Sequence, residues 1–145
     1  MKIEDILSEW KLDTIIDNAN LVEESRKAPY LHSKYLEYLM NEKKAMYLMQ
    51  RDVKRLRLEL RDHLENPTVE GKAKGFLAKV NPKRRLIKSE YEDITNGDDI
   101  ITQAEANLDF QKAKVDCLEK IIWEIARRKD HISNIIRQNT YLAGM

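Results

Sequence analysis

Apolar side chains recur every three, four or seven residues along two long stretches of this 145-residue chain. Such spacing is typical of long helices whose apolar side chains form a packing seam on one face. The fold class predicted from this pattern is therefore all-α, with long helices that form a hairpin or a coiled-coil-like homo-oligomer. The first seam comprises Tyr35, Leu39, Met46, Met49, Val53, Leu56, Leu60 and Leu64. The second comprises Ile101, Ala104, Leu108, Val115, Leu118, Ile122, Ile125, Ile132 and Ile136.

Polar residues and proline suggest where the helices begin and where they are interrupted. Residues 2–10 are predicted to form a short amphipathic helix, and Asn20 is predicted to cap the first long helix. Pro29 lacks an amide hydrogen, so it should either kink that helix or end it. Asp98 or Asp99 is the expected cap of the second long helix.

Residues 66–97 separate the two seams and are predicted to form an irregular, basic connector. Extended pieces at 75–80 and 85–87 would allow a small β-hairpin within it. The helix breakers in this segment are Pro67, Gly71, Gly75, Pro82 and Gly97. The predicted regions of the single domain are a helical region 1–65, the connector 66–97 and a C-terminal helix 98–145.

Charges are sorted along the chain although the net charge is only +1. Residues 43–88 contain 14 basic and 5 acidic residues, whereas residues 1–42 contain 5 and 9, and residues 89–120 contain 3 and 9. A positive band between two negative ones attracts polyanions at short range. Nucleic acid is therefore the first partner to consider.

Basic residues on the first long helix are the best candidates for contacts with nucleic acid. Lysine and arginine bind phosphates, and aromatic side chains stack on bases. Tyr47, Phe76 and Tyr91 are the candidate stacking residues. The predicted DNA-binding residues are Lys54, Arg55, Arg57 and Arg61 on the helix, and Lys83, Arg84 and Arg85 in the connector.

Two other function classes explain the same basic band. In one, the chain is a coiled-coil structural or adaptor protein whose band binds an acidic protein partner. In the other, the chain is an architectural protein that binds duplex DNA. Binding assays with single- and double-stranded DNA distinguish the three classes.

No catalytic, metal or cofactor site is predicted from the residue patterns. A phosphate-binding P-loop around Gly71-Lys72 would need glycine at position 66 and serine or threonine at position 73, where the chain has Asn66 and Ala73. The three histidines lie far apart in sequence, and Cys117 is the only cysteine. We therefore expect a non-enzymatic protein without a disulfide, a signal peptide or a membrane span.

Several segments, in their order and spacing, are similar to one known protein family. They are KIEDIL at 2–7, PYLHSKYL at 29–36, DDII at 98–101, LDFQK at 108–112 and YLAG at 141–144. Nearly the full length of the chain resembles the UvsY family, the recombination mediators of T-even-like bacteriophages.

This resemblance implies an oligomer, expected to be a hexamer or heptamer, that binds single-stranded DNA in the cytoplasm of the infected bacterial host. It also implies two protein partners, the UvsX-like phage recombinase and the phage single-strand-binding protein. A member of the family helps the recombinase load onto DNA that the single-strand-binding protein already coats. No cofactor is implied.

The resemblance also assigns roles to particular residues. The family's DNA-contacting motif reads leucine-basic-x-basic-leucine-acidic, and the matching segment here is 54–59. Arg55 and Arg57 take its basic positions, and Lys54 stands where the first leucine is expected. The C-terminal helix is implied to assemble the oligomer. The expected interface residues are Leu108, Val115, Leu118, Ile122, Ile125 and Ile132.

Overall fold

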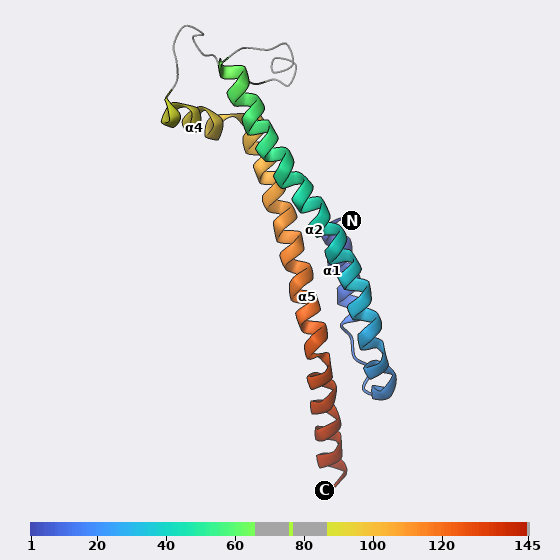
Figure 1. Cartoon of the computed structure of the whole chain (residues 1–145). Coiled ribbons are helices and arrows are strands. Elements are labelled where there is room, and N and C mark those ends of the chain that lie inside the picture. Colours follow the sequence, from blue (N-terminus) through green and yellow to red (C-terminus); the bar gives the residue numbers. More distant parts are fainter. Residues whose placement is uncertain (66–75, 77–86, 145) are drawn as a thin grey trace. The chain divides into compact units, whose positions relative to one another are not determined.

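The structure, a computed structural model, describes residues 1–65, residue 76 and residues 87–144 (Figure 1). These residues contain four helices and no strand, which confirms the predicted all-α class. The extended pieces predicted at 75–80 and 85–87 fall almost entirely outside the described residues. The helices are α1 (Ile3–Asp13), α2 (Leu21–Glu65), α4 (Lys88–Gly97) and α5 (Asp99–Ala143).

The long helices begin where the polar residues predicted. Helix α2 starts directly after Asn20, and α5 starts directly after Asp98. The Oδ1 atom of Asp98 accepts hydrogen bonds from the backbone amides of Ile100 (2.9 Å) and Ile101 (3.2 Å), which otherwise have no partner in the first turn. Asp98 is thus the N-cap of α5.

Helix α2 continues through Pro29, so an end of the helix at that residue is the wrong alternative. A proline inside a helix costs about 3 kcal/mol, because it removes one hydrogen bond and crowds the preceding turn. Leu31 and Tyr35 follow within the next two turns and are buried. The apolar area that they remove from water offsets this local cost.

Helix α4 occupies the last ten residues of the segment predicted to be an irregular connector. Its only breaker is Gly97, which stands at its final residue. The Glu90 carboxylate accepts a hydrogen bond from the Ile87 amide at 3.1 Å and so satisfies a donor at the start of the helix. Tyr91 and Ile94 pack against buried apolar residues, so tertiary contacts stabilise this short helix.

The chain divides into two compact units, each containing part of α2 and part of α5. Unit 1 comprises Met1–Lys43 and Ala113–Met145, and unit 2 comprises Lys44–Lys112. Among the described residues, no helix has both the length and the apolar character that a membrane span requires.

In unit 1, α1 lies beside α2, and the parts of α2 and α5 run antiparallel (Figure 1). Glu24 pairs with Arg128, whereas Glu42, further along α2, pairs with Lys114, earlier in α5. The Tyr35 ring is completely buried. The buried apolar side chains of this unit are Ile6, Leu31, Tyr35, Leu39, Val115, Leu118, Ile121, Ile125 and Ile132.

Polar contacts attach α1 and the segment after it to the long helices of unit 1. Asp13, the last residue of α1, accepts hydrogen bonds from the Lys34 ammonium (2.6 Å) and the Tyr35 hydroxyl (2.8 Å). The buried Arg128 guanidinium donates to the Asp13, Thr14 and Ile15 carbonyls. These contacts hold the end of α1 against both long helices.

Unit 2 is built around the end of α2 and the start of α5. Its buried cluster consists of Leu60, Leu64, Phe76 and Ile101. Leu56 of α2 and Tyr91 of α4 are partly buried against this cluster. Packing of α4 on the cluster therefore fixes the position of its side chains beside α2.

Candidate nucleic-acid interface

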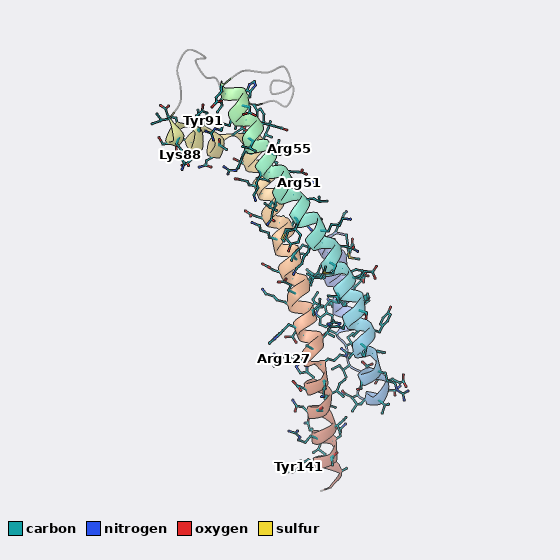
Figure 2. The ribbon with its side chains drawn as sticks, in the orientation of Figure 1. Arg51, Arg55, Lys88, Tyr91, Arg127 and Tyr141 are labelled. Atoms are coloured by element: carbon teal, nitrogen blue, oxygen red, sulfur yellow. The ribbon has the colours of Figure 1, made fainter. Side chains whose placement is uncertain are left out.

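A stripe of exposed cations follows one face of α2 within unit 2. Its members are three, four or seven residues apart, so they lie on the same side of the helix. Figure 2 shows the side chains of two of them, Arg51 and Arg55. The stripe consists of Lys44, Arg51, Lys54, Arg55 and Arg61, all of which are exposed.

The acidic residues near the stripe neutralise only part of its charge. Arg55 lies 3.2 Å from the Asp52 carboxylate and 3.8 Å from that of Glu59. Arg51 lies 4.0 Å from Asp52, at the limit of an ion pair. Lys54 forms no ion pair with any residue that the structure describes. Exposed pairs of this kind are weak and exchange easily with other anions.

Arg57 lies three residues after Lys54 and four before Arg61, but it forms an ion pair with a residue of another helix. Its guanidinium binds the Glu105 carboxylate of α5, and Nε donates to Glu105 Oε1 at 2.9 Å. Both side chains are about three-fifths buried. Of the two residues at the basic positions of the family motif, therefore, Arg55 is exposed and Arg57 is engaged within unit 2.

The three candidate stacking residues differ in their accessibility. Tyr47 is 58% exposed and lies on α2 between Lys44 and Arg51. Phe76 is buried in the cluster of unit 2, so it offers no surface for a base. Tyr91 of α4 is half-buried, and the Arg61 guanidinium lies over its ring, 5.1 Å from the centroid.

Lys88 is an exposed cation that the sequence patterns assigned to the irregular connector. It is the first residue of α4, and with Arg61 and Tyr91 it lines one groove of unit 2. Figure 2 shows Lys88 and Tyr91 on this short helix. The helical spacing from Lys88 to Tyr91 and Glu92 is the signal that could have grouped these residues.

The second predicted DNA-binding cluster, Lys83, Arg84 and Arg85, lies outside the described residues and stays a prediction.

The six residues predicted to form the oligomer interface lie in both compact units. Leu108 is buried in unit 2, and Ile122 is half-buried in unit 1. The other four, Val115, Leu118, Ile125 and Ile132, are buried in unit 1.

Packing within one chain already accounts for the apolar character of these interface candidates. Their role between subunits therefore stays a prediction. Ile136, the last residue of the same seam, differs from them because it is 48% exposed.

Among the described residues, no group of three histidine, cysteine, aspartate or glutamate side chains is placed to hold a metal ion. Cys117 is half-buried on α5 and lines a groove in unit 1 with Leu7, Trp10 and Ile121. In unit 1, the pKa values of Asp13, Glu24, Lys34, Tyr35 and Tyr38 are displaced from their ordinary values. Burial raises the pKa of Glu24, but hydrogen bonds from Lys27 and Arg128 outweigh this effect and leave it below the ordinary value.

Comparison with solved structures finds the same fold in a bacteriophage T4 protein. A crystal structure of the bacteriophage T4 recombination mediator protein UvsY, in lattice type II, aligns with a TM-score of 0.78 and 23% identity. The alignment covers 99% of this chain and 98% of the other. The lattice type I structure gives a TM-score of 0.74, with 23% identity over 94% of this chain and 98% of the other.

Comparison with curated proteins finds no match. A family model, described as "Recombination, repair and ssDNA binding protein UvsY", matches residues 9–145. That match covers all of unit 2, most of unit 1 and the whole of α2, α4 and α5. The chain therefore belongs to the UvsY family, as its sequence patterns suggested.

Proposed function

We propose that this chain is a recombination mediator that binds single-stranded DNA through the exposed stripe on α2. The observation that carries the proposal is the set of five cations on one face of the helix, opposite the apolar seam. Membership of a family described as ssDNA-binding supports it. At 1.5 Å per residue, the stripe extends over about 25 Å of the helix axis, long enough to contact several phosphates.

The stripe residues should contribute unequally to binding. Lys54 has no ion pair with the described residues, so its charge is fully available to a phosphate. Arg55 has to exchange Asp52 and Glu59 for DNA, which costs little at the surface. Arg57 would first have to leave Glu105, so it should contribute less than either. Lys83, Arg84 and Arg85 are proposed as a second DNA-binding cluster.

The proposed mechanism is multivalent rather than catalytic. The protein forms a homo-oligomer, a hexamer or heptamer, with Leu108, Val115, Leu118, Ile122, Ile125 and Ile132 contributing to its assembly. Stripes from several subunits bind one strand, and linked sites gain roughly 10²–10⁴ in avidity over one site. A strand held in this way is presented to the UvsX-like recombinase while the single-strand-binding protein is displaced. This activity takes place in the cytoplasm of the infected bacterial host.

A recombinase-loading assay tests the mediator function. Single-stranded DNA is first coated with the phage single-strand-binding protein, and the ATPase rate of the phage recombinase is then measured with and without this protein. The proposal predicts that adding the protein shortens the lag before the recombinase becomes active. A lag that is unchanged at saturating protein would contradict a mediator function.

Direct binding assays distinguish the alternative class. If no single-stranded DNA binds even at low salt, the stripe is instead a surface for an acidic protein partner, as in a coiled-coil adaptor. Equal affinity for duplex and single-stranded DNA would indicate an architectural DNA-binding protein.

A further inference from the structure

Unit 2 contains a small groove between the exposed stripe on α2 and the short helix α4. Its volume is about 200 Å³. Arg57, Leu58 and Arg61 of α2 line it on one side, and Lys88, Tyr91, Glu92 and Thr95 of α4 line it on the other. The Arg57 guanidinium is already paired with Glu105. Pockets for drug-sized ligands usually measure about 300–1,000 Å³, so this groove suits a single ring system.

The groove offers a flat surface for stacking. The Arg61 guanidinium lies over the Tyr91 ring, 5.1 Å from its centroid, so two planar groups are already associated. The Tyr91 hydroxyl donates a hydrogen bond to Glu65 Oε1 at 2.9 Å, which fixes the direction of the ring. Leu58 adds an apolar side chain that is 61% exposed. Aromatic rings and guanidinium planes are the groups on which unpaired bases stack.

The charged groups of the groove favour a base attached to a phosphate over a free phosphate. Lys88 is an exposed cation at the first residue of α4 and can bind a phosphate of the strand. Glu92, also exposed, only accepts hydrogen bonds at neutral pH, and its negative charge repels a phosphate. The exocyclic amino groups of bases are donors that suit this carboxylate.

We propose that this groove binds one unpaired nucleobase of a DNA strand, with Arg61 and Tyr91 as the stacking surface and Lys88 as the contact to the adjoining phosphate. This inference rests on the proposed binding of single-stranded DNA by the stripe, because Arg61 belongs to both surfaces. Under this proposal, single strands bind in preference to duplex DNA. A paired base is stacked inside the duplex, and extracting it costs a few kcal/mol.

The first test uses the unaltered protein and two fluorescent oligonucleotides of equal length, one normal and one built of abasic residues. The backbone charge is the same in both, so only contacts to bases distinguish them. We expect the normal strand to bind about 5- to 150-fold more tightly, the range expected for stacking of one base. Equal affinity for the two strands would overturn the groove proposal and leave binding by the stripe intact. Failure to bind either strand would overturn both.

The second test locates the base dependence in the groove. The Tyr91→Leu variant keeps an apolar side chain against the core of unit 2 but removes the aromatic ring. The Tyr91→Phe variant keeps the ring and removes only the hydroxyl. We expect Tyr91→Leu to abolish most of the difference between normal and abasic strands and Tyr91→Phe to retain most of it. Tyr141→Leu is the matched control, because Tyr141 is 69% exposed and lies in unit 1.

The Lys88→Ala variant tests the phosphate contact without disturbing the packing of unit 2, because the Lys88 side chain is exposed. It should weaken binding of single strands and reduce the salt dependence by about 0.7 in slope, the value for one phosphate. The groove proposal would be overturned if Tyr91→Leu, shown by circular dichroism to be folded, discriminated against abasic strands as strongly as the unaltered protein.

Discussion

Replacing Arg128 by methionine should destabilise unit 1 far more than the loss of any exposed charge. Arg128 is 3% exposed although its side chain carries a permanent charge. Its guanidinium donates to the carbonyls of Asp13 (3.2 Å), Thr14 (3.4 Å) and Ile15 (3.2 Å) and binds the Glu24 carboxylate. One side chain of α5 is thus connected to the end of α1 and the start of α2.

The loss in free energy of unfolding can be estimated from the Glu24 carboxylate, which the substitution leaves without its buried partner. Glu24 is 3% exposed, and without Arg128 its remaining cation is Lys27, 3.0 Å away and itself largely exposed. Removing one partner of a buried ion pair costs about 3–5 kcal/mol. The lower end applies here, because Arg128 Nε has no hydrogen-bond partner among the described residues and is lost without cost. A loss of about 3 kcal/mol lowers a urea midpoint by roughly 1–3 M.

Urea unfolding followed by circular dichroism measures this effect, at one fixed protein concentration because association also stabilises the fold. Lys129→Met is the matched control, since Lys129 is the next residue of α5 and is exposed. Its midpoint should stay close to that of the unaltered protein. The double variant Glu24→Leu with Arg128→Met should lose less than the sum of the single losses, because no unpaired charge remains. Additive losses, or an Arg128→Met midpoint equal to the control, would refute the buried pair as a source of stability.

Three further outcomes are expected in urea unfolding. Burial raises the pKa of Asp13 and of Glu24, but hydrogen bonds from neighbouring donors outweigh it, so both lie below their ordinary values of 3.8 and 4.5. The two carboxylates stabilise the fold fully above about pH 4.5, and this stabilisation is lost as the pH falls through their folded-state pKa values. The urea midpoint should therefore be lower at pH 3 than at pH 6, and equal midpoints would contradict this. Leu60→Ala should cost about 2–5 kcal/mol, because Leu60 is completely buried in unit 2, and a loss below 1 kcal/mol would show that the cluster matters little. Asp98→Ala should cost about 1 kcal/mol through the lost N-cap of α5, and an unchanged midpoint would argue against that cap.

The apolar part of the core could be predicted from the sequence because the helical period determines which side chains share a face. Tyr35, Leu60, Leu118 and Ile125 were all assigned to seams from spacing alone, and all four are buried. The beginnings of both long helices could also be predicted, because a capping residue acts on the backbone amides within one turn of the helix. Local signals of this kind need no knowledge of the partner helix.

The polar part of the core could not be predicted in the same way. Arg128 lies three residues after Ile125 and four before Ile132, so it continues the seam, yet a charged residue is normally expected in solvent. Its burial depends on Glu24, which lies on another helix about 100 positions away. The pairing of α2 with α5 in unit 1 decides this contact, and one helix alone does not contain that information.

Helix α4 was missed for a related reason. Its ten residues are mostly polar, and a helix of this length is marginal without packing. Contacts of Tyr91 and Ile94 with the cluster of unit 2 make it stable, and those contacts join segments distant in sequence. The groove between α2 and α4 was therefore also beyond prediction from the sequence.

In the candidate site, too, positions along one helix could be predicted from the sequence, whereas contacts between helices could not. Helical spacing groups the predicted DNA-binding residues Lys54, Arg55 and Arg61 on α2, and the structure shows that all three are exposed. The same spacing could not show that Arg57 binds Glu105, because that carboxylate belongs to α5. Their contacts with DNA stay predictions.

The salt dependence of single-stranded DNA binding is the decisive measurement for the stripe. A fluorescent oligonucleotide is titrated at several salt concentrations with the double variant Lys54→Ala, Arg55→Ala. Lys112→Ala with Lys129→Ala is the control, because it removes two exposed charges from α5. Binding by the stripe predicts that the first pair reduces the slope of log K against log salt by about 1.4, or 0.7 per phosphate, while the control leaves it unchanged. Equal slopes for both pairs would contradict DNA binding by α2.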